Sequence, residues 1–188
     1  MSSEEDFYRT DKQQVKQSFG RAAPSYDEAA VLQREVADRL LERLSVVKLQ
    51  PERILDVGCG TGYATQALLR RYPRAQMLAL DLAPSMLAAT RARGSWRRKI
   101  RCVCGDAEQL PLAGDSVDLV VSNLTLQWCQ DLDGSFQELF RVLRPGGLLM
   151  FTSFGPDTLR ELRRAWAAVD DRSHVNAFID MHDVGDGL

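Results

Sequence analysis

A short run of glycines separates a predicted strand from a predicted helix in the first half of the chain. Residues 54–57 read ILDV, which is typical of a short buried strand, and residues 58–62 read GCGTG. Glycine lets the backbone turn sharply and approach a ligand closely, so the run predicts a ligand-binding loop. The glycines alternate with other residues, unlike those of the dinucleotide fingerprint. This tight spacing favours a ligand with a small zwitterionic group rather than a pyrophosphate.

Short apolar segments alternate with helical ones after this loop. We expect strands at 54–57, 77–80, 100–104, 117–122 and 148–154, and helices at 63–71, 84–93, 132–143 and 156–169. This alternation predicts an α/β fold with a parallel sheet covered by helices on both faces. Ligands of such sheets bind at the carboxyl ends of the strands, where the strand order reverses.

Two helices are predicted before the first strand. The first begins at Asp11 and ends near Gly20; the second covers 27–46, with Asp27 as its N-cap. The second carries an apolar stripe, formed by Leu32, Val36, Leu40 and Leu44 together with Ala37 and Leu41. We therefore divide the chain into an N-terminal helical cap (1–48), an α/β core (49–155) and a C-terminal helix-and-loop cap (156–188).

Acidic residues stand at the ends of three consecutive strands. Asp56 is in the first strand, Asp81 ends the second, and Asp106 follows the third. In this kind of fold, an acid in the position of Asp81 faces ribose hydroxyls, and Asp106 could accept from the amine of an adenine. Each acid alone is commonly a solvated carboxylate at a loop end. Their combination with the glycine loop favours a nucleoside ligand.

Composition excludes several classes of protein. Lys plus Arg is 24 and Asp plus Glu is 26, so the net charge of −2 argues against a nucleic-acid-coating protein. No apolar run is long enough to span a membrane, and the polar start MSSEED is unlike a signal peptide. The four cysteines and two histidines lack zinc-site spacing, so we expect no metal. Free thiols fit the cytoplasm, with Cys102, Cys104 and Cys129 expected as small core residues.

Several motifs together resemble the class I S-adenosylmethionine-dependent methyltransferases. They are ILDVGCGTG at 54–62, Asp81, GDAEQLP at 105–111 and LRPGG at 143–147. The resemblance implies a Rossmann-like, doubly wound sheet and S-adenosylmethionine as cofactor, with S-adenosylhomocysteine as product. The cofactor-binding residues that it implies are Gly58, Gly60 and Gly62 for the methionine part, Asp81 for the ribose, Asp106 and Ala107 for the adenine, Asn123 near the methyl donor, and Asp56 and Leu82 elsewhere in the cofactor site.

A narrower resemblance spans nearly the whole chain. The segments KQSF at 16–19, YD at 26–27 and QWC at 127–129 are similar to those of malonyl-acyl-carrier-protein O-methyltransferases of biotin synthesis. This resemblance implies methylation of the free carboxylate of malonyl-acyl-carrier protein or malonyl-CoA. Two alternatives remain open: a methyltransferase for another small acid or a quinone precursor, and a methyltransferase-like assembly protein that binds a partner.

The candidate catalytic residues are Tyr26, Gln127, Trp128 and Arg163. A carboxylate acceptor is ionised at pH 7 and needs no general base, which agrees with the position of both histidines after residue 170. Arg163 could hold a carboxylate, Tyr26 could close over the cofactor, and His174 could donate to the acyl group. The alternatives are a solvated helix face for the arginine, packed aromatic rings for Tyr26 and Trp128, and an ordinary loop position for the histidine.

Two further features complete the sequence prediction. Arg91, Arg93, Arg97, Arg98, Lys99 and Arg101 surround Trp96. We expect a solvated face there, with docking of an acidic carrier protein or of RNA as alternatives. The family's sheet has seven strands and only five are predicted, so we expect the C-terminal hairpin to be missing and the fifth strand to be an edge. We expect a monomer with neither a membrane nor a nucleic acid as partner.

Overall fold

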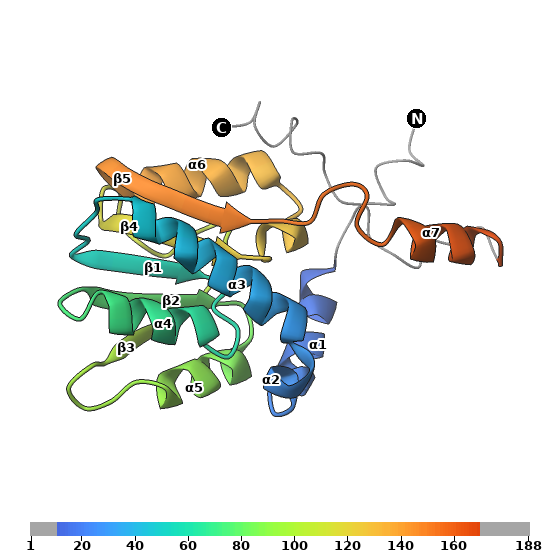
Figure 1. The fold of residues 1–188 in the computed structure, drawn as a ribbon, viewed down its shortest axis with the longest axis horizontal. Coiled ribbons are helices and arrows are strands. Elements are labelled where there is room, and N and C mark those ends of the chain that lie inside the picture. Colours follow the sequence, from blue (N-terminus) through green and yellow to red (C-terminus); the bar gives the residue numbers. More distant parts are fainter. Residues whose placement is uncertain (1–10, 170–188) are drawn as a thin grey trace.

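The computed structural model describes residues 11–169 and contains one five-stranded parallel sheet (Figure 1). Its strands are β1 (Arg53–Val57), β2 (Gln76–Asp81), β3 (Ile100–Cys104), β4 (Val117–Asn123) and β5 (Leu143–Thr152). They lie in the order β3-β2-β1-β4-β5. The chain adds β2 and β3 on one side of the central strand β1, and then β4 and β5 on its other side. The strand order therefore reverses between β1 and β4. This confirms the predicted Rossmann-like, doubly wound α/β fold.

Helices cover both faces of the sheet. The helices are α1 (Lys12–Ala22), α2 (Tyr26–Ala29), α3 (Val31–Arg43), α4 (Tyr63–Arg71), α5 (Pro84–Ala92), α6 (Leu132–Val142) and α7 (Arg160–Ala167), with short 3-10 turns η2 (Leu44–Val46) and η3 (Leu126–Trp128). The alternation of side chains along each strand produces two cores. Ile54 of β1 packs with Leu40 and Leu68 of α3 and α4, whereas the next residue, Leu55, packs with Phe136 of α6.

The prediction of one helix over 27–46 is wrong about where that helix begins. The structure has a one-turn helix, α2, and then a separate helix, α3, that begins at Val31. Asp27 caps neither helix, because its carboxylate accepts from Thr61 and pairs with Arg93. The apolar stripe is buried only towards the end of α3, at Ala37 and Leu40 and at Leu44 beyond it, while Leu32 is 53% exposed.

Other boundaries also differ from the prediction, and α7 begins at Arg160 rather than 156. Helix α1 continues through Gly20 to Ala22, and Asp11 caps it by accepting from the amide of Gln13 at 2.8 Å. Strand β5 begins at Leu143 rather than 148, because Val117 of β4 already pairs with Leu143. β5 is one edge of the sheet within the described part of the chain, and β3 is the other.

The cysteines are only partly in the core. All four are free thiols, and Cys59 is buried. Cys102 and Cys129 are half-buried, as small apolar residues can be, but Cys104 is exposed. The prediction for Cys104 is wrong: Cys104 is the last residue of β3, which is an edge strand of the sheet.

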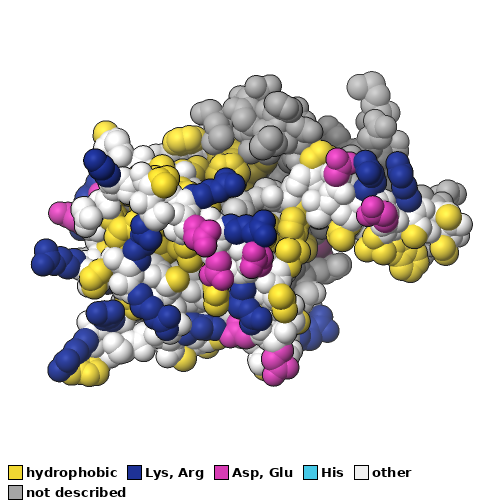
Figure 2. Space-filling view, viewed as in Figure 1, with side chains coloured by type: hydrophobic (Ala, Val, Ile, Leu, Met, Phe, Trp, Pro, Cys, Tyr) yellow, Lys and Arg dark blue, Asp and Glu magenta, His cyan; other side chains and the backbone are white. Residues whose placement is uncertain are grey.

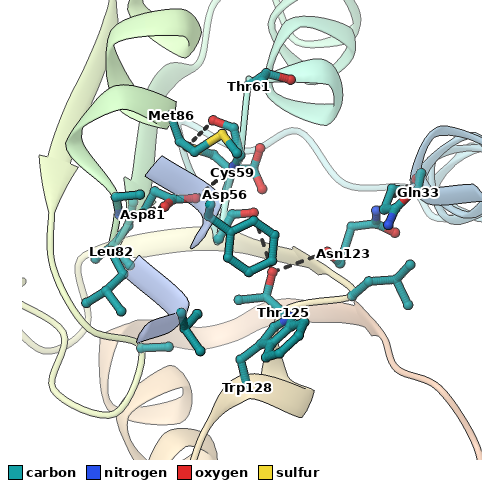
Figure 3. Close-up of a pocket in the computed structure, with 18 of the residues that line it drawn as sticks. Gln33, Asp56, Cys59, Thr61, Asp81, Leu82, Met86, Asn123, Thr125 and Trp128 are labelled. Atoms are coloured by element: carbon teal, nitrogen blue, oxygen red, sulfur yellow. Dashed lines mark hydrogen bonds between the residues drawn. The ribbon is translucent and has the colours of Figure 1, made fainter. Parts of the chain in front are cut away.

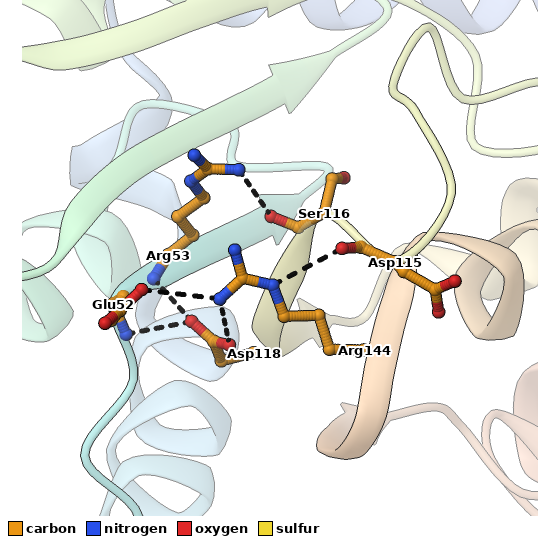
Figure 4. A network of polar contacts seen from close by, with 6 residues as sticks. All are labelled: Glu52, Arg53, Asp115, Ser116, Asp118 and Arg144. Atoms are coloured by element: carbon orange, nitrogen blue, oxygen red, sulfur yellow. Dashed lines mark hydrogen bonds and ion pairs between the residues drawn. The ribbon is translucent and has the colours of Figure 1, made fainter.

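A polar network ties the amino ends of three strands together (Figure 4). The Asp118 carboxylate of β4 accepts from the amides of Glu52 and Arg53 at 2.9 and 2.8 Å and pairs with Arg144 of β5 at 2.8 Å. Burial alone would raise the pKa of Asp118, but the Arg53 amide and the Arg144 guanidinium outweigh it and hold this pKa below its usual value. The network fixes the end of the sheet opposite the glycine loop.

No helix among residues 11–169 has both the length and the apolar character that crossing a membrane requires. Figure 2 shows basic and acidic side chains interspersed over the visible face of the sheet domain. Hydrophobic side chains gather along one side of α7, where Leu162 and Trp166 are 45% and 39% exposed.

Candidate functional site

A cleft lies at the carboxyl ends of the strands, beneath α1 and α2 (Figure 3). Its walls are the glycine loop, the residues that follow β2, β3 and β4, and side chains of α1, α2 and α3. Figure 3 shows Asp81 and Leu82 on one side of the cleft, with Gln33 and Asn123 on the other. The cleft includes 11 of the predicted site residues: Tyr26, Asp56, Gly58, Gly60, Asp81, Leu82, Asp106, Ala107, Asn123, Gln127 and Trp128.

The three glycines of the loop have different surroundings although all have positive φ, at +70°, +55° and +86°. A Cβ on Gly58 would lie 2.1 Å from Thr125 Oγ1, and one on Gly62 would lie 2.7 Å from Thr90 Oγ1. Among the described residues, a Cβ on Gly60 would meet only Tyr26, with Cε1 at 4.0 Å. Gly60 therefore opens onto the cleft, whereas Gly62, outside the lining, lets the loop pack against α5.

Asp81 joins the glycine loop to the end of β2. Its carboxylate accepts from the amide of Gly60 at 2.9 Å through one oxygen and from the amide of Ala83 at 2.8 Å through the other. Burial raises the pKa of Asp81, and the amides of Ala83 and Gly60 offset part of that rise. Each oxygen keeps a lone pair, so the carboxylate can still accept from two hydroxyls of a diol.

Asp56 lies beneath the loop and is only 1% exposed. Burial raises the pKa of Asp56 to about 7, although the hydroxyl of Thr65 donates to its carboxylate. The hydrogen bond ties β1 to α4 next to the glycine turn. Asp56 is thus part of the floor that supports the loop.

Asp106 is paired with a residue that the sequence did not single out. Lys12 Nζ of α1 lies 2.5 Å from Asp106 Oδ2 and 2.8 Å from Glu108 Oε1. Burial alone would lower the pKa of Lys12, but hydrogen bonds to the two carboxylates raise it above its usual value. The pairs fasten the start of α1 over the end of the cleft that contains Asp106 and the buried Ala107.

Asn123 joins three elements at the end of β4. Its Nδ2 donates to the carbonyl of Gln33 in α3 at 3.0 Å, and its Oδ1 accepts from the hydroxyl of Thr152 in β5 at 2.8 Å. The next residue, Leu124, is held at a φ of +52°, an uncommon conformation for a non-glycine residue that is often found at functional sites. One donor and one acceptor of the Asn123 amide are therefore already used for positioning.

Aromatic rings form the roof of the cleft. The ring centroid of Phe19 in α1 lies 6.1 Å from that of Tyr26 and 5.4 Å from that of Trp128, both in edge-to-face geometry. Burial, and then the charge of Asp81, raises the pKa of the Tyr26 phenol. Gln127 also lines the cleft, and its buried Oε1 has no hydrogen-bond partner among the described residues.

Other predicted residues lie elsewhere. Arg163 is in α7, but its side chain lies outside the described part of the structure, as does His174, so their roles stay predictions. Within residues 11–169, no cluster of His, Cys, Asp and Glu could hold a metal ion. In the basic cluster, five side chains are exposed and the Arg97 guanidinium lies 4.6 Å from the Trp96 ring centroid, whereas Arg93 is turned inward.

Comparison with known proteins shows the family to which the chain belongs. Residues 55–151 match the family described as "Methyltransferase domain". The chain is 56% identical over 97% of its length to the malonyl-[acyl-carrier protein] O-methyltransferase of Halorhodospira halophila, and 54% identical over 95% to that of Gallionella capsiferriformans. It spans 62% and 63% of these two relatives.

Solved structures share the fold. A Haloferax volcanii methyltransferase, solved in complex with the Trm112 methyltransferase activator, superposes with a TM-score of 0.73 at 23% identity, over 92% of this chain and 73% of that one. A Thermotoga maritima methyltransferase gives 0.69 at 19%, over 92% and 77%. The family match covers the glycine loop, the acidic strand ends and β4, and we conclude that this chain belongs to the methyltransferase domain family.

Proposed function

We propose that this chain transfers the methyl group of S-adenosylmethionine to the free carboxylate of malonyl-acyl-carrier protein, or of malonyl-CoA, in biotin synthesis. One observation carries the proposal: five relatives named malonyl-[acyl-carrier protein] O-methyltransferase are 52–56% identical to the chain over 95–98% of its length. The chain spans only 62–64% of those relatives, so the activity of the whole protein is inferred from them.

The cleft fits this cofactor. Bound there, S-adenosylmethionine would supply an electrophilic methyl group on a sulfonium. The open surface above Gly60 suits its amino-acid part, and the free lone pairs of Asp81 suit the two ribose hydroxyls. Asp106 would accept from the adenine amine beside the apolar wall of Ala107. Asp56, Gly58, Gly62, Leu82 and Asn123 complete the proposed cofactor site.

The protein's part in the reaction is alignment and exclusion of water. A malonyl carboxylate is already ionised at neutral pH, so no residue has to remove a proton from it. Tyr26 and Trp128, with Phe19 between them, cover the cleft and would keep water from the reacting carboxylate. Alignment of two reactants can lower a barrier by roughly 7–11 kcal/mol.

Cations are needed to attract the acceptor carboxylate. Lys16 and Arg34 line the described cleft, and we propose Arg163 of α7 as a further contact. Gln127, whose Oε1 is unpaired among the described residues, would contact the acyl group. We place the reaction in the cytoplasm and propose that the protein is a monomer. Its proposed parts are an N-terminal helical cap (1–48), an α/β core (49–155) and a C-terminal cap (156–188).

Incubation of the protein with S-adenosylmethionine and malonyl-acyl-carrier protein, followed by mass spectrometry, tests the proposal. We expect a mass increase of one methylene group on the malonyl carrier, and a parallel assay tests malonyl-CoA. The carrier loaded with an acetyl group is the matched control, because it lacks the free carboxylate. Binding of S-adenosylhomocysteine without methyl ester on either malonyl thioester would reject the acceptor and keep the cofactor.

A further inference from the structure

A group of polar contacts fastens the one-turn helix α2 to the glycine loop. Asp27 of α2 accepts from the Thr61 hydroxyl at 2.5 Å through Oδ1 and from Nη2 of Arg93 at 2.5 Å through Oδ2. The Nε of Arg93 donates to the carbonyl of Thr61 at 2.6 Å. Arg34 also donates to the carbonyl of Asp27. We call the contacts among Asp27, Thr61 and Arg93 the α2 clasp.

Helix α2 has little stability of its own. It contains four residues, and the side chain of Ser25 at its start makes no capping hydrogen bond. A single turn of helix is unfavourable in isolation, because its first hydrogen bond does not offset the cost of ordering the backbone. The position of α2 must therefore come from contacts with the rest of the molecule, and the clasp supplies a charged pair and two hydrogen bonds.

The residue next to Asp27 is the one that covers the glycine loop. Tyr26 Cε1 lies 4.0 Å from the position of a Cβ on Gly60, and the Tyr26 ring packs against Phe19. Because Tyr26 and Asp27 are consecutive in one helical turn, whatever holds the carboxylate of Asp27 also sets the place of the Tyr26 ring.

We propose that Arg93 is a positioning residue that holds Tyr26 over the glycine loop through Asp27, and so keeps the cofactor site covered. The ligand in this inference rests on the proposed function. Arg93 does not line the cleft, so it acts through Asp27 and Thr61 rather than by touching the cofactor.

The chemistry of the clasp requires arginine. One guanidinium reaches two acceptors on different segments, the Thr61 carbonyl through Nε and the Asp27 carboxylate through Nη2. The ammonium of lysine is a single point of charge on a flexible stem and cannot reproduce this planar fork. The Arg93 side chain is 24% exposed and that of Asp27 is 49% exposed, so the pair is only partly screened by water.

Hydrogen exchange of the ligand-free protein tests the clasp without any cofactor. In Arg93→Gln and in Asp27→Asn, we expect the amides of residues 12–30 to exchange roughly fivefold faster, the factor that a partly exposed charge pair supplies. The effects of the two changes on the exchange rate should combine to less than their product in the double variant, because both changes break the contact between Asp27 and Arg93. Arg91→Gln is the matched control, since Arg91 is an exposed residue in the last turn of α5, the helix whose C-cap is Arg93.

Calorimetry with S-adenosylhomocysteine then tests the positioning role. We expect the dissociation constant to rise roughly fivefold in Arg93→Gln, with Arg93→Lys between it and the wild type and Arg91→Gln unchanged. The KM for S-adenosylmethionine should rise more than kcat falls, and the unfolding midpoint should show that every variant is folded.

The outcomes separate the clasp from the proposed function. Equal exchange in Arg93→Gln and Arg91→Gln overturns the clasp whatever the ligand. Faster exchange with unchanged affinity for S-adenosylhomocysteine overturns the positioning role. A wild-type protein that binds no S-adenosylhomocysteine overturns the proposed function and with it the positioning role, while the exchange measurements still decide whether the clasp holds α2.

Discussion

Two carboxylates, the buried Asp56 and the half-buried Asp81, dominate the electrostatics of the cleft. Burial raises the pKa of both, to about 7 for Asp56, because water no longer stabilises the charged form. They differ in their partners: Asp81 accepts from two backbone amides, whereas a threonine hydroxyl donates to Asp56. The first arrangement leaves a carboxylate that can bind a diol, and the second supports the loop.

Replacement of Asp81 by Ala should weaken binding of S-adenosylhomocysteine by about 1–3 kcal/mol, because hydrogen bonds to a charged group are lost. Isothermal titration calorimetry measures this difference. Cys104→Ser is a control, since this exposed residue lies outside the cleft lining. Unchanged affinity in Asp81→Ala would contradict the ribose role of this residue.

The raised pKa of Asp56 predicts a pH-dependent stability. An acid whose pKa is higher in the folded protein contributes stability that is complete below its unfolded pKa of 3.8 and is lost as pH rises to about 7. In Asp56→Asn, the amide side chain does not titrate in this pH range. Its unfolding free energy relative to wild type should therefore rise between about pH 4 and 7, by on the order of 1–4 kcal/mol, and then level off.

Urea unfolding of the ligand-free protein at several pH values measures this effect. The Thr65 hydroxyl can still donate to the amide oxygen of an asparagine, so the local packing is preserved. A difference in unfolding free energy between Asp56→Asn and wild type that stays constant from pH 4 to 8 would show that folding does not raise the pKa of Asp56.

Local chemistry defines the ends of several elements. Asp131 precedes α6, and its Oδ1 accepts from the amide of Gly134 at 2.8 Å, while its carbonyl accepts from the Ser135 hydroxyl at 2.7 Å. The cap matters because α6 covers one face of the sheet with Phe136 and Leu139, both almost fully buried. The hydrogen bond of Asp131 at the surface therefore stabilises a helix whose buried side chains form part of a core.

Replacement of Asp131 by Ala should lower the unfolding free energy by about 1 kcal/mol through loss of this N-cap. Asp133→Ala is the matched control: Asp133 is exposed in the first turn of the same helix, and its removal costs only its smaller interaction with the helix dipole. Chemical unfolding of both variants measures the difference. Equal losses would indicate that charge rather than the cap stabilises this helix.

Different groups of polar contacts stabilise the molecule at the two ends of the sheet. At the amino ends of the strands, Asp118 joins β1, β4 and β5 (Figure 4). At the carboxyl ends, the pairs of Lys12 and the α2 clasp fasten the N-terminal helices over the cleft. The first group of contacts joins the strands of the sheet, and the second holds α1 and α2 over the cleft.

Replacement of Asp118 by Asn should cost about 1–2 kcal/mol at pH 7, because Arg144 loses one of its two charged partners and the amides of Glu52 and Arg53, which both donate to Oδ2, lose a charged acceptor. The pKa of Asp118 is lowered in the folded protein, so its contribution is present above the unfolded pKa of 3.8 and is lost as pH falls through the folded value. The stabilities of variant and wild type should therefore converge in acid.

Denaturant unfolding at pH 7 and at pH 3 checks this behaviour. Asp115→Asn is the control: it lies in the same network but contributes only its main-chain carbonyl, to Arg144. A loss in Asp118→Asn that persists unchanged in acid would mean that the charge of this residue is not what stabilises the sheet.

The sequence by itself determined the sheet and the position of the site. The alternation of apolar runs and helical stretches predicted all five strands, and the loop from Gly58 to Gly62, with acids at the following strand ends, predicted the edge of the sheet at which the cleft lies. These features are local: a strand, a turn and a helix are each encoded within about ten residues, and the carboxyl ends of parallel strands must meet at one edge.

Only the tertiary structure decided how the site is covered. From the sequence, Asp27 was predicted as a helix cap and Arg93 as part of a solvated basic face, and Lys12 was not singled out. In the folded chain, Asp27 pairs with Arg93, 66 residues away, and Lys12 with Asp106, 94 residues away. The physical reason is that a charged side chain can take a local partner, a distant one or water, and which it takes depends on what folding brings within reach.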